Sequence, residues 1–195
     1  MAQINWQKTE GESIHIQYTD LPGLLLVSPY VRDSFKEDLT EVLDLKGSNF
    51  LPEFVQDNTS LSEKVHTLRG MHYQQPPHAQ AKLVRCAQGK LLDVVVDIRI
   101  GSETFGKCHA EVLSAENRLR VFVPKGFLHG FLTLADNTLI EYKCSDFYAP
   151  DCDGSVHWNS FGFDWGDIEP VISEKDAGAV PFEAFSSPFR YGVEG

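Results

Sequence analysis

A succession of short strand-like segments between residues 82 and 148 constrains the fold more than any other feature of the chain. Segments such as KLVRCA, KLLDVVVDIRI, RLRVFVP and NTLIEYKCSDFY are rich in β-branched, aromatic and aliphatic residues. Turn-forming strings (QG, GSETFG, AEN, PKG and ADN) separate the segments at close intervals, as expected for antiparallel strands. Because no helices intervene, the pattern predicts an all-β jelly-roll barrel and disfavours a parallel α/β fold.

The segments before and after these strands are expected to surround the barrel. Residues 35–45 (FKEDLTEVLDL) place Phe35, Leu39, Val42 and Leu43 at helical spacing, which predicts one short amphipathic helix. The last residues, rich in Gly, Pro and Asp, predict covering loops or short helices. We expect a single domain over residues 1–195, with an N-terminal arm at about 1–50, a barrel at about 51–165 and a covering segment at 166–195.

Charge and composition narrow the functional classes. The formal net charge is −11 without any long Lys/Arg run, which argues against nucleic-acid binding because counterion release requires a basic face. The chain has no apolar stretch of the roughly eighteen residues that a membrane helix needs, and its start lacks a signal-peptide pattern. Its 4 cysteines form no CxxC pair, which indicates free thiols. We therefore expect a cytoplasmic protein that binds neither nucleic acid nor membranes.

Alternation within residues 82–100 determines which charges could enter the barrel. Lys82, Val84 and Cys86 share one face of a strand, and Asp93 shares a face with Val95. One face of each strand points into a barrel, so the pattern allows a cation or a carboxylate inside. Periodicity alone leaves both possibilities open and favours the solvated outside, where charges are commoner.

The segment PKGFLHGF raises the question of a metal site. It resembles the second motif of the cupins, which are small jelly-roll barrels that often hold a metal, and it would supply His129. The first cupin motif would add a His-x-His pair, which the chain lacks, and His72 and His78 stand six residues apart. One ligand cannot complete a site that needs three or four. We expect a cupin-type double-stranded jelly-roll barrel with a few short helices, without a metal or another cofactor.

Several longer blocks resemble one family. LRGMHYQQPPHAQAKLVRCAQGKLLDVVVDIRIGSETFG, VPKGFLHGFLTL, IEYKCSDFYAP and ISEKDAGAV are similar, in order, to the signature blocks of dTDP-4-dehydrorhamnose 3,5-epimerases, from about residue 54 to 182. That family consists of dimeric, metal-independent cupins that invert carbons 3 and 5 of a nucleotide-linked 4-keto-6-deoxyhexose. The resemblance implies a homodimeric isomerase with a nucleotide-sugar substrate, acting in the supply of dTDP-rhamnose or another deoxysugar.

The resemblance implies four catalytic residues. His72 of LRGMHYQ would take the proton beside the ketone, and Asp176 of SEKD would hold the ring of His72. Lys82 of AKLVR would stabilise the enolate oxygen, and Tyr142 of IEYKC would return a proton. These residue types suit the chemistry, because the carbanion needs its developing charge stabilised and inversion needs an acid opposite the base.

Other matching positions imply substrate binding. Arg69 would contact the diphosphate, for which its planar, forked side chain is suited. His129 and Tyr148 would line the sugar pocket, and Gln56 and Asn58 of FVQDN resemble positions near the nucleotide. The resemblance also makes Asp93 a neighbour that supports the pocket, and it leaves His78 as a loop residue.

The segment YVRDSFKE aligns with the family pattern Asp-x-Arg-Gly-x-Phe-x-Glu. It keeps Arg32, Phe35 and Glu37 but has Tyr30 in place of Asp and Asp33 in place of Gly. In relatives this arm reaches into the partner subunit's site, where the Arg meets phosphate and the others meet the base. The departures leave the natural nucleotide open.

Two alternatives to a dTDP-sugar 3,5-epimerase also remain open. The same base and acid would serve a single-site epimerase, or an epimerase for a GDP-, CDP- or UDP-linked 4-keto sugar. A non-catalytic sugar-binding cupin would keep Arg69 and His129 but lose the base or the acid. All the catalytic positions hold the expected residue types, which favours an enzyme.

Overall fold

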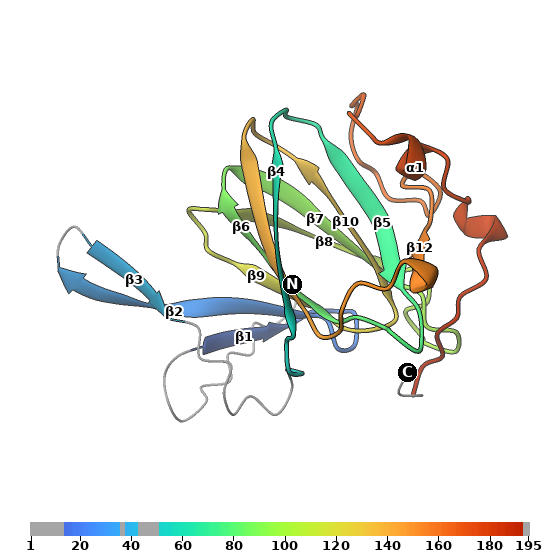
Figure 1. Cartoon of the computed structure of the whole chain (residues 1–195), viewed down its shortest axis with the longest axis horizontal. Coiled ribbons are helices and arrows are strands. Elements are labelled where there is room, and N and C mark those ends of the chain that lie inside the picture. The colour runs from blue at the N-terminus through green and yellow to red at the C-terminus, as the bar shows by residue number, and fades with distance from the viewer. Residues whose placement is uncertain (1–13, 36–37, 43–50, 193–195) are drawn as a thin grey trace.

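The computed structural model describes residues 14–35, 38–42 and 51–192. Two antiparallel sheets face one another in these residues, and helices are few and short (Figure 1). The strands are β1 (Ile14–Tyr18), β2 (Leu25–Phe35), β3 (Asp38–Val42), β4 (Gln56–Ser62), β5 (Leu68–Gln74), β6 (Lys82–Gln88), β7 (Lys90–Asp97), β8 (Cys108–Ser114), β9 (Arg120–Val123), β10 (Phe127–Thr133), β11 (Thr138–Cys144) and β12 (Asp153–Ser155). The helical elements are η1 (Pro150–Cys152), α1 (Glu174–Ala177) and η2 (Phe182–Ala184).

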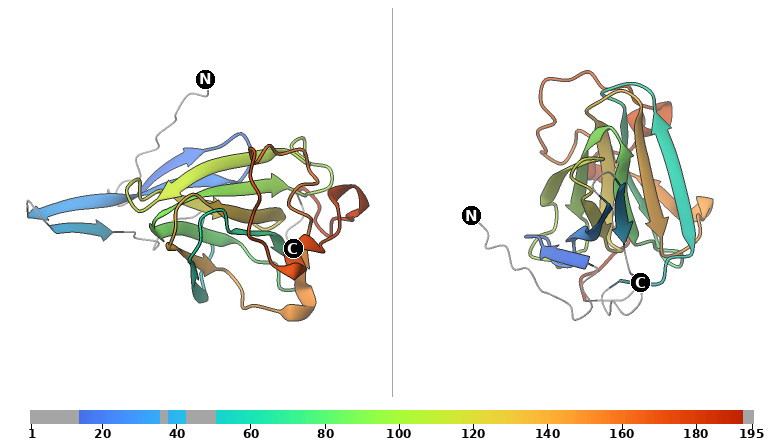
Figure 2. Two further views of the ribbon diagram at one scale, coloured as in Figure 1. Left: turned by 90° about the horizontal axis from the view of Figure 1, so that it is seen from above. Right: turned by 90° about the vertical axis from the view of Figure 1, so that its left-hand side faces the viewer.

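The order of the strands gives the barrel its two walls. The 7-stranded sheet runs β1-β2-β9-β6-β11-β4, with β3 paired to β2, and the 5-stranded sheet runs β12-β5-β10-β7-β8. Figure 2 shows the same two layers from two further directions. This arrangement confirms the predicted all-β jelly-roll barrel.

Strand β7 is buried on both sides, which explains its nearly continuous apolar sequence. Leu91 and Val95 belong to the core between the sheets. Val94 and Val96 belong to a second core, which includes Trp165 of the C-terminal segment. A strand covered on both faces needs apolar residues at successive positions, so β7 loses the alternation of a half-exposed strand.

Two glycines let β5 and β10 approach closely beside the pocket. A Cβ atom on Gly130 would lie 2.6 Å from Met71 Sδ and 2.8 Å from Arg69 O. One on Gly70, which has a φ of +135°, would lie 2.6 Å from Gly130 Cα. Only glycine fits at this crossing, and the close approach sets His129 opposite His72 in the strand register.

The predicted helix at residues 35–45 is wrong over the part that the structure describes. Asp38–Val42 forms strand β3, which pairs antiparallel with β2. An amphipathic segment this short is marginal as an isolated helix, whereas pairing with β2 gives its backbone a partner. The β2–β3 hairpin extends away from the barrel (Figures 1 and 2).

The C-terminal segment runs along the outer side of the 5-stranded sheet (Figure 1). Isolated bridges tie it to the barrel, among them Thr67 with Val171 and Val156 with Val180. Ser173 begins the short helix α1, and its hydroxyl accepts a hydrogen bond from the backbone N–H of Asp176. The segment thereby holds Asp176 against β5.

No helix within residues 14–35, 38–42 and 51–192 is long and apolar enough to cross a membrane.

Candidate functional site

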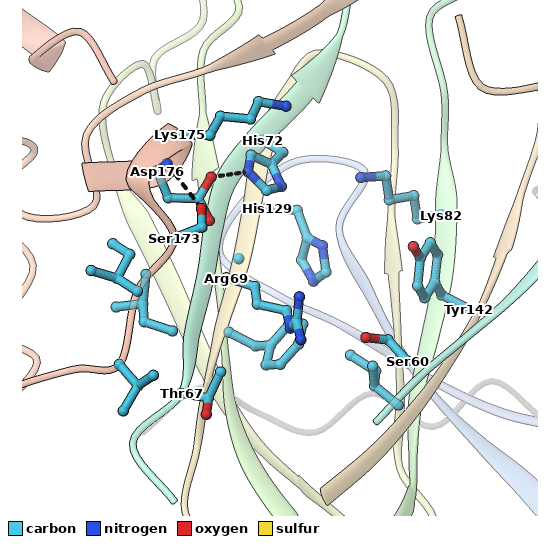
Figure 3. Close-up of a pocket in the computed structure, with 16 residues that line it drawn as sticks. Ser60, Thr67, Arg69, His72, Lys82, His129, Tyr142, Ser173, Lys175 and Asp176 are labelled. Carbon is cyan, nitrogen blue, oxygen red and sulfur yellow. Dashed lines mark hydrogen bonds and ion pairs between the residues drawn. The ribbon is translucent and has the colours of Figure 1, made fainter. Parts of the chain in front are cut away.

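A pocket of about 520 Å³ lies between the two sheets and contains the residues assigned to catalysis (Figure 3). His72 and His129 come from β5 and β10 of the 5-stranded sheet. Lys82 and Tyr142 come from β6 and β11 of the 7-stranded sheet. A ligand between the sheets would therefore have His72 on one side and Tyr142 on the other.

His72 and Asp176 form the dyad of the pocket. His72 Nε2 lies 2.7 Å from Asp176 Oδ1, and Asp176 Oδ2 accepts from the backbone N–H of Gly70 at 3.3 Å. Burial alone would raise the pKa of Asp176, but hydrogen bonds from His72, Gly70 and Ser173 hold it below the usual value. A charged Asp176 keeps a proton on His72 Nε2, which leaves Nδ1 as the nitrogen able to accept one.

In the wall that faces His72, burial shifts the pKa values of Lys82 and Tyr142 in opposite directions. Burial lowers the pKa of Lys82, and Cys144, Asp153 and Asp93 offset this lowering only in part. Burial raises the pKa of Tyr142, so its phenol keeps its proton at neutral pH. The wall therefore offers an amine that can carry a positive charge and a neutral proton donor. Alternation along the strand favours the solvated outside for Lys82, but this lysine lines the pocket.

His129 is held by a buried carboxylate. Its Nε2 lies 2.8 Å from Oδ2 of Asp93, which is only 1% exposed. Strand pairing sets His129 opposite His72 on one side and Val95 of β7 on the other. Asp93 thus supports the pocket through His129, in the neighbouring position that the resemblance implied.

A second hollow of about 430 Å³ adjoins the first and shares His72, Lys82 and Tyr142 with it. Gln56 and Asn58, on alternate positions of β4, line this hollow together with Tyr148. The predicted nucleotide and sugar positions are thus next to the residues assigned to catalysis.

Arg69 lines the first hollow near the start of β5. Its Nε donates to Ser62 Oγ at 3.3 Å. The remaining predicted binding residues belong to the N-terminal arm. Arg32 and Phe35 fall on β2, where their side chains are not described, and Glu37 lies outside the described residues.

The pocket also contains two charged residues that the sequence interpretation did not assign. Lys175 lines both hollows, and Asp153 lines the second. Lys175 Nζ donates to Asp153 Oδ2, and this bond raises the pKa of Lys175. Lys175 immediately precedes Asp176 in the SEKD block, so that block was the signal that could have identified it.

The remaining predictions concern His78 and metal binding. His78 lies on the loop after β5, and its Nδ1 is 3.3 Å from Asp146 Oδ2. In the part of the chain that the structure describes, no group of three or more His, Cys, Asp or Glu side chains could hold a metal ion.

Comparisons with known proteins agree on one family. The model of dTDP-4-dehydrorhamnose 3,5-epimerase matches residues 19–184. The enzyme of that name from Salmonella typhimurium is 41% identical over 168 residues, which are 83% of this chain and 91% of the relative. The crystal structure of dTDP-6-deoxy-D-glucose-3,5-epimerase from Legionella pneumophila, in complex with dTDP-4-keto-L-rhamnose, has a TM-score of 0.83 at 33% identity and covers 92% of this chain and 100% of its own. A 3′-monoepimerase from Streptomyces bikiniensis, in complex with dTDP-quinovose, has a TM-score of 0.76 at 34% identity and covers 84% and 85%.

Proposed function

The chain belongs to the dTDP-4-dehydrorhamnose 3,5-epimerase family, and we propose that it is an isomerase that inverts carbons 3 and 5 of a dTDP-4-keto-6-deoxyhexose. One observation carries this proposal. His72 stands on the 5-stranded sheet, where Asp176 of α1 is hydrogen-bonded to it, and it faces Lys82 and Tyr142 on the other sheet (Figure 3). Base and acid on opposite sides of one pocket are what inversion of a carbon centre requires.

The reaction follows from these positions. His72 takes the proton from a carbon beside the C4 ketone, and the electron pair of the broken C–H bond moves onto the ketone oxygen as an enolate. The ammonium of Lys82 stabilises that oxygen. Tyr142 then gives its proton to the opposite face of the same carbon. Solvent removes the proton from His72 and restores the one on Tyr142, so the net reaction consumes no proton.

Binding of the nucleotide part fits the second hollow. Gln56 and Asn58 offer amide groups to a base, and Tyr148 offers an aromatic ring. Arg69, which lines the adjoining first hollow, offers its guanidinium to the diphosphate. We assign the sugar to the first hollow, because of the two it is the one lined by Asp176 and His129 in addition to His72, Lys82 and Tyr142.

A single-site epimerase is the second candidate function. The observation that favours it is the similarity to the 3′-monoepimerase, which is 34% identical.

Incubation with dTDP-, UDP-, GDP- and CDP-linked 4-keto-6-deoxyglucose, with kcat/KM measured for each, tests the choice of nucleotide. We expect the dTDP sugar to give the highest value. A higher kcat/KM with another nucleotide would overturn the assignment of the base.

The alkaline limb of the pH profile should report Lys82. Burial lowers the pKa of Lys82 below 10.5 and raises that of Tyr142 above 10.0. The charged lysine is therefore lost as pH rises, and kcat/KM should fall with a midpoint below pH 10.5. In Lys82→Arg the guanidinium stays charged, so the limb should move to higher pH even if the maximum rate is lower. An unmoved limb would mean that another group controls it.

We also propose that the protein acts as a homodimer. The β2–β3 hairpin, whose backbone carries Arg32 and Phe35, extends away from the barrel to which it belongs (Figure 1). A hairpin in that position suits contact with a second copy. Sedimentation should give about twice the chain mass of 21.9 kDa, and a mass of one chain would contradict the proposal.

A further inference from the structure

Gln74 is a buried polar residue of the cavity wall that the proposed reaction does not use. It follows His72 by two positions on β5 and is 5% exposed. Its Nε2 donates to Phe147 O at 3.0 Å and to His78 O, and its Oε1 accepts from the backbone N–H of Ala149 at 2.9 Å. Both hydrogens of the amide are therefore engaged within the protein and are not available to a ligand.

These bonds fix the backbone on both sides of Tyr148. Gln56 Oε1 accepts from the N–H of Tyr148 itself at 3.0 Å. Two residues before Tyr148, the backbone carbonyl of Asp146 accepts from Gln80 Nε2 at 2.8 Å. Glutamine side chains thus bind successive backbone groups of residues 146–149, in the way that a neighbouring strand would. The aromatic residues of this segment had predicted a longer strand, but β11 ends at Cys144.

Apolar packing holds this segment only weakly. Phe147 is 64% exposed and Tyr148 is 55% exposed, so burial contributes little to their position. The Tyr148 hydroxyl donates to Asp153 Oδ2 at 3.2 Å, at a solvent-exposed position. Of the three glutamines that bind this loop, Gln74 is the buried one and binds it twice, so its bonds are the restraint least accessible to water on a loop that would otherwise open easily.

We propose that Gln74 is a positioning residue that holds Tyr148 in the wall of the second hollow and so sets the affinity for the nucleotide sugar. The proposal rests on the proposed function, since it takes Tyr148 to contact the substrate. Its physical basis is preorganisation, because a ligand that meets an ordered loop does not have to order it on binding. Because Gln74 acts through Tyr148, its removal should weaken binding and leave the chemical step unchanged.

A variant with matching length and no hydrogen-bonding amide tests the proposal. Gln74→Met should raise the Kd for dTDP, measured by calorimetry, and the KM of the substrate by roughly tenfold. Its kcat should stay within about twofold of the parent. The matched control is Gln88→Met, which also loses a glutamine bond to a backbone carbonyl, that of Asn137, at the end of β6 away from the cavity. The control should change none of these values.

A double-mutant cycle separates positioning from a general structural effect. In a Tyr148→Ala background, Gln74→Met should add little to the loss of dTDP affinity, because the residue that it positions is already absent. An equal loss in both backgrounds would overturn the proposal, and so would unchanged dTDP affinity in Gln74→Met. If Gln74→Met fails to fold, Gln74→Glu serves in the same cycle, since it keeps the acceptor for Ala149 and loses the donors.

Amide hydrogen exchange in the ligand-free protein makes the test independent of the enzymatic function. The N–H groups of Tyr148 and Ala149 should exchange faster in Gln74→Met than in the parent or in Gln88→Met. Unchanged exchange there contradicts the positioning role even in an active epimerase. Faster exchange in a protein that has no epimerase activity contradicts the proposed function instead.

Discussion

Replacing His72 with asparagine should lower the rate of solvent deuterium exchange into the substrate by about 10²–10⁴-fold, the usual contribution of a general base. Asparagine keeps a polar side chain beside Asp176 but has no ring nitrogen that can accept a proton. The expected loss falls on kcat, because His72 acts on the reacting carbon and contributes little to holding the nucleotide. Proton NMR in D₂O measures the exchange, and dTDP calorimetry measures the binding.

The matched control for this substitution is His66→Asn. His66 is exposed and has a φ of 60°, a conformation that asparagine tolerates, so the control should fold and exchange like the parent. If His72→Asn retained more than about a tenth of the parent rate, the proton would have to leave through another group.

Replacing Lys82 with methionine should lower turnover by about 10²–10³-fold and should leave the melting temperature equal to or above that of the parent. The rate falls because removal of one oxyanion-stabilising group has this typical effect. Stability is retained because burial lowers the pKa of Lys82, which means that the folded pocket disfavours its charge. Among the residues that the structure describes, no ion pair with Lys82 compensates for this cost. Methionine keeps the length of the side chain without the charge.

A second lysine gives the contrasting control. Lys143 precedes Cys144 on β11, and its Nζ lies 2.7 Å from Asp57 Oδ1 in an exposed ion pair. Lys143→Met should leave turnover unchanged and lower the melting temperature only slightly, since exposed pairs stabilise weakly. A Lys82→Met protein that melts well below the parent would show that the ammonium supports the fold rather than the reaction.

The strands and the barrel could be predicted because they follow from local alternation and turn residues. The same rules failed where pairing or side-chain bonds decided the structure. Residues 38–42 have a helical spacing of apolar residues, yet they pair with β2. Phe147 and Tyr148 look like strand residues, yet glutamines hold them in a loop. The first outcome depends on pairing with the preceding strand and the second on glutamines 73 and 92 positions earlier, and the spacing of apolar residues indicates neither.

The site was predictable to the extent that its residues stand in recognisable blocks. Periodicity alone allowed Lys82 to point either into the barrel or out to solvent, and the family resemblance is what assigned it to the site. Asp176 lies 104 positions from His72, so no local pattern could have paired them. Lys175 and Asp153 were missed because their relevance depends on how α1 and β12 meet beside β5.

Position-resolved deuterium exchange tests the central claim most directly. The parent protein is incubated with dTDP-4-keto-6-deoxyglucose in D₂O, and proton NMR follows the signals of the hydrogens on carbons 3 and 5. We predict that both signals disappear and that the product has the inverted configuration at both carbons. Loss of the signal at only one carbon would contradict 3,5-epimerisation and favour a single-site epimerase, and retention of both signals would contradict the assignment of this pocket to epimerisation.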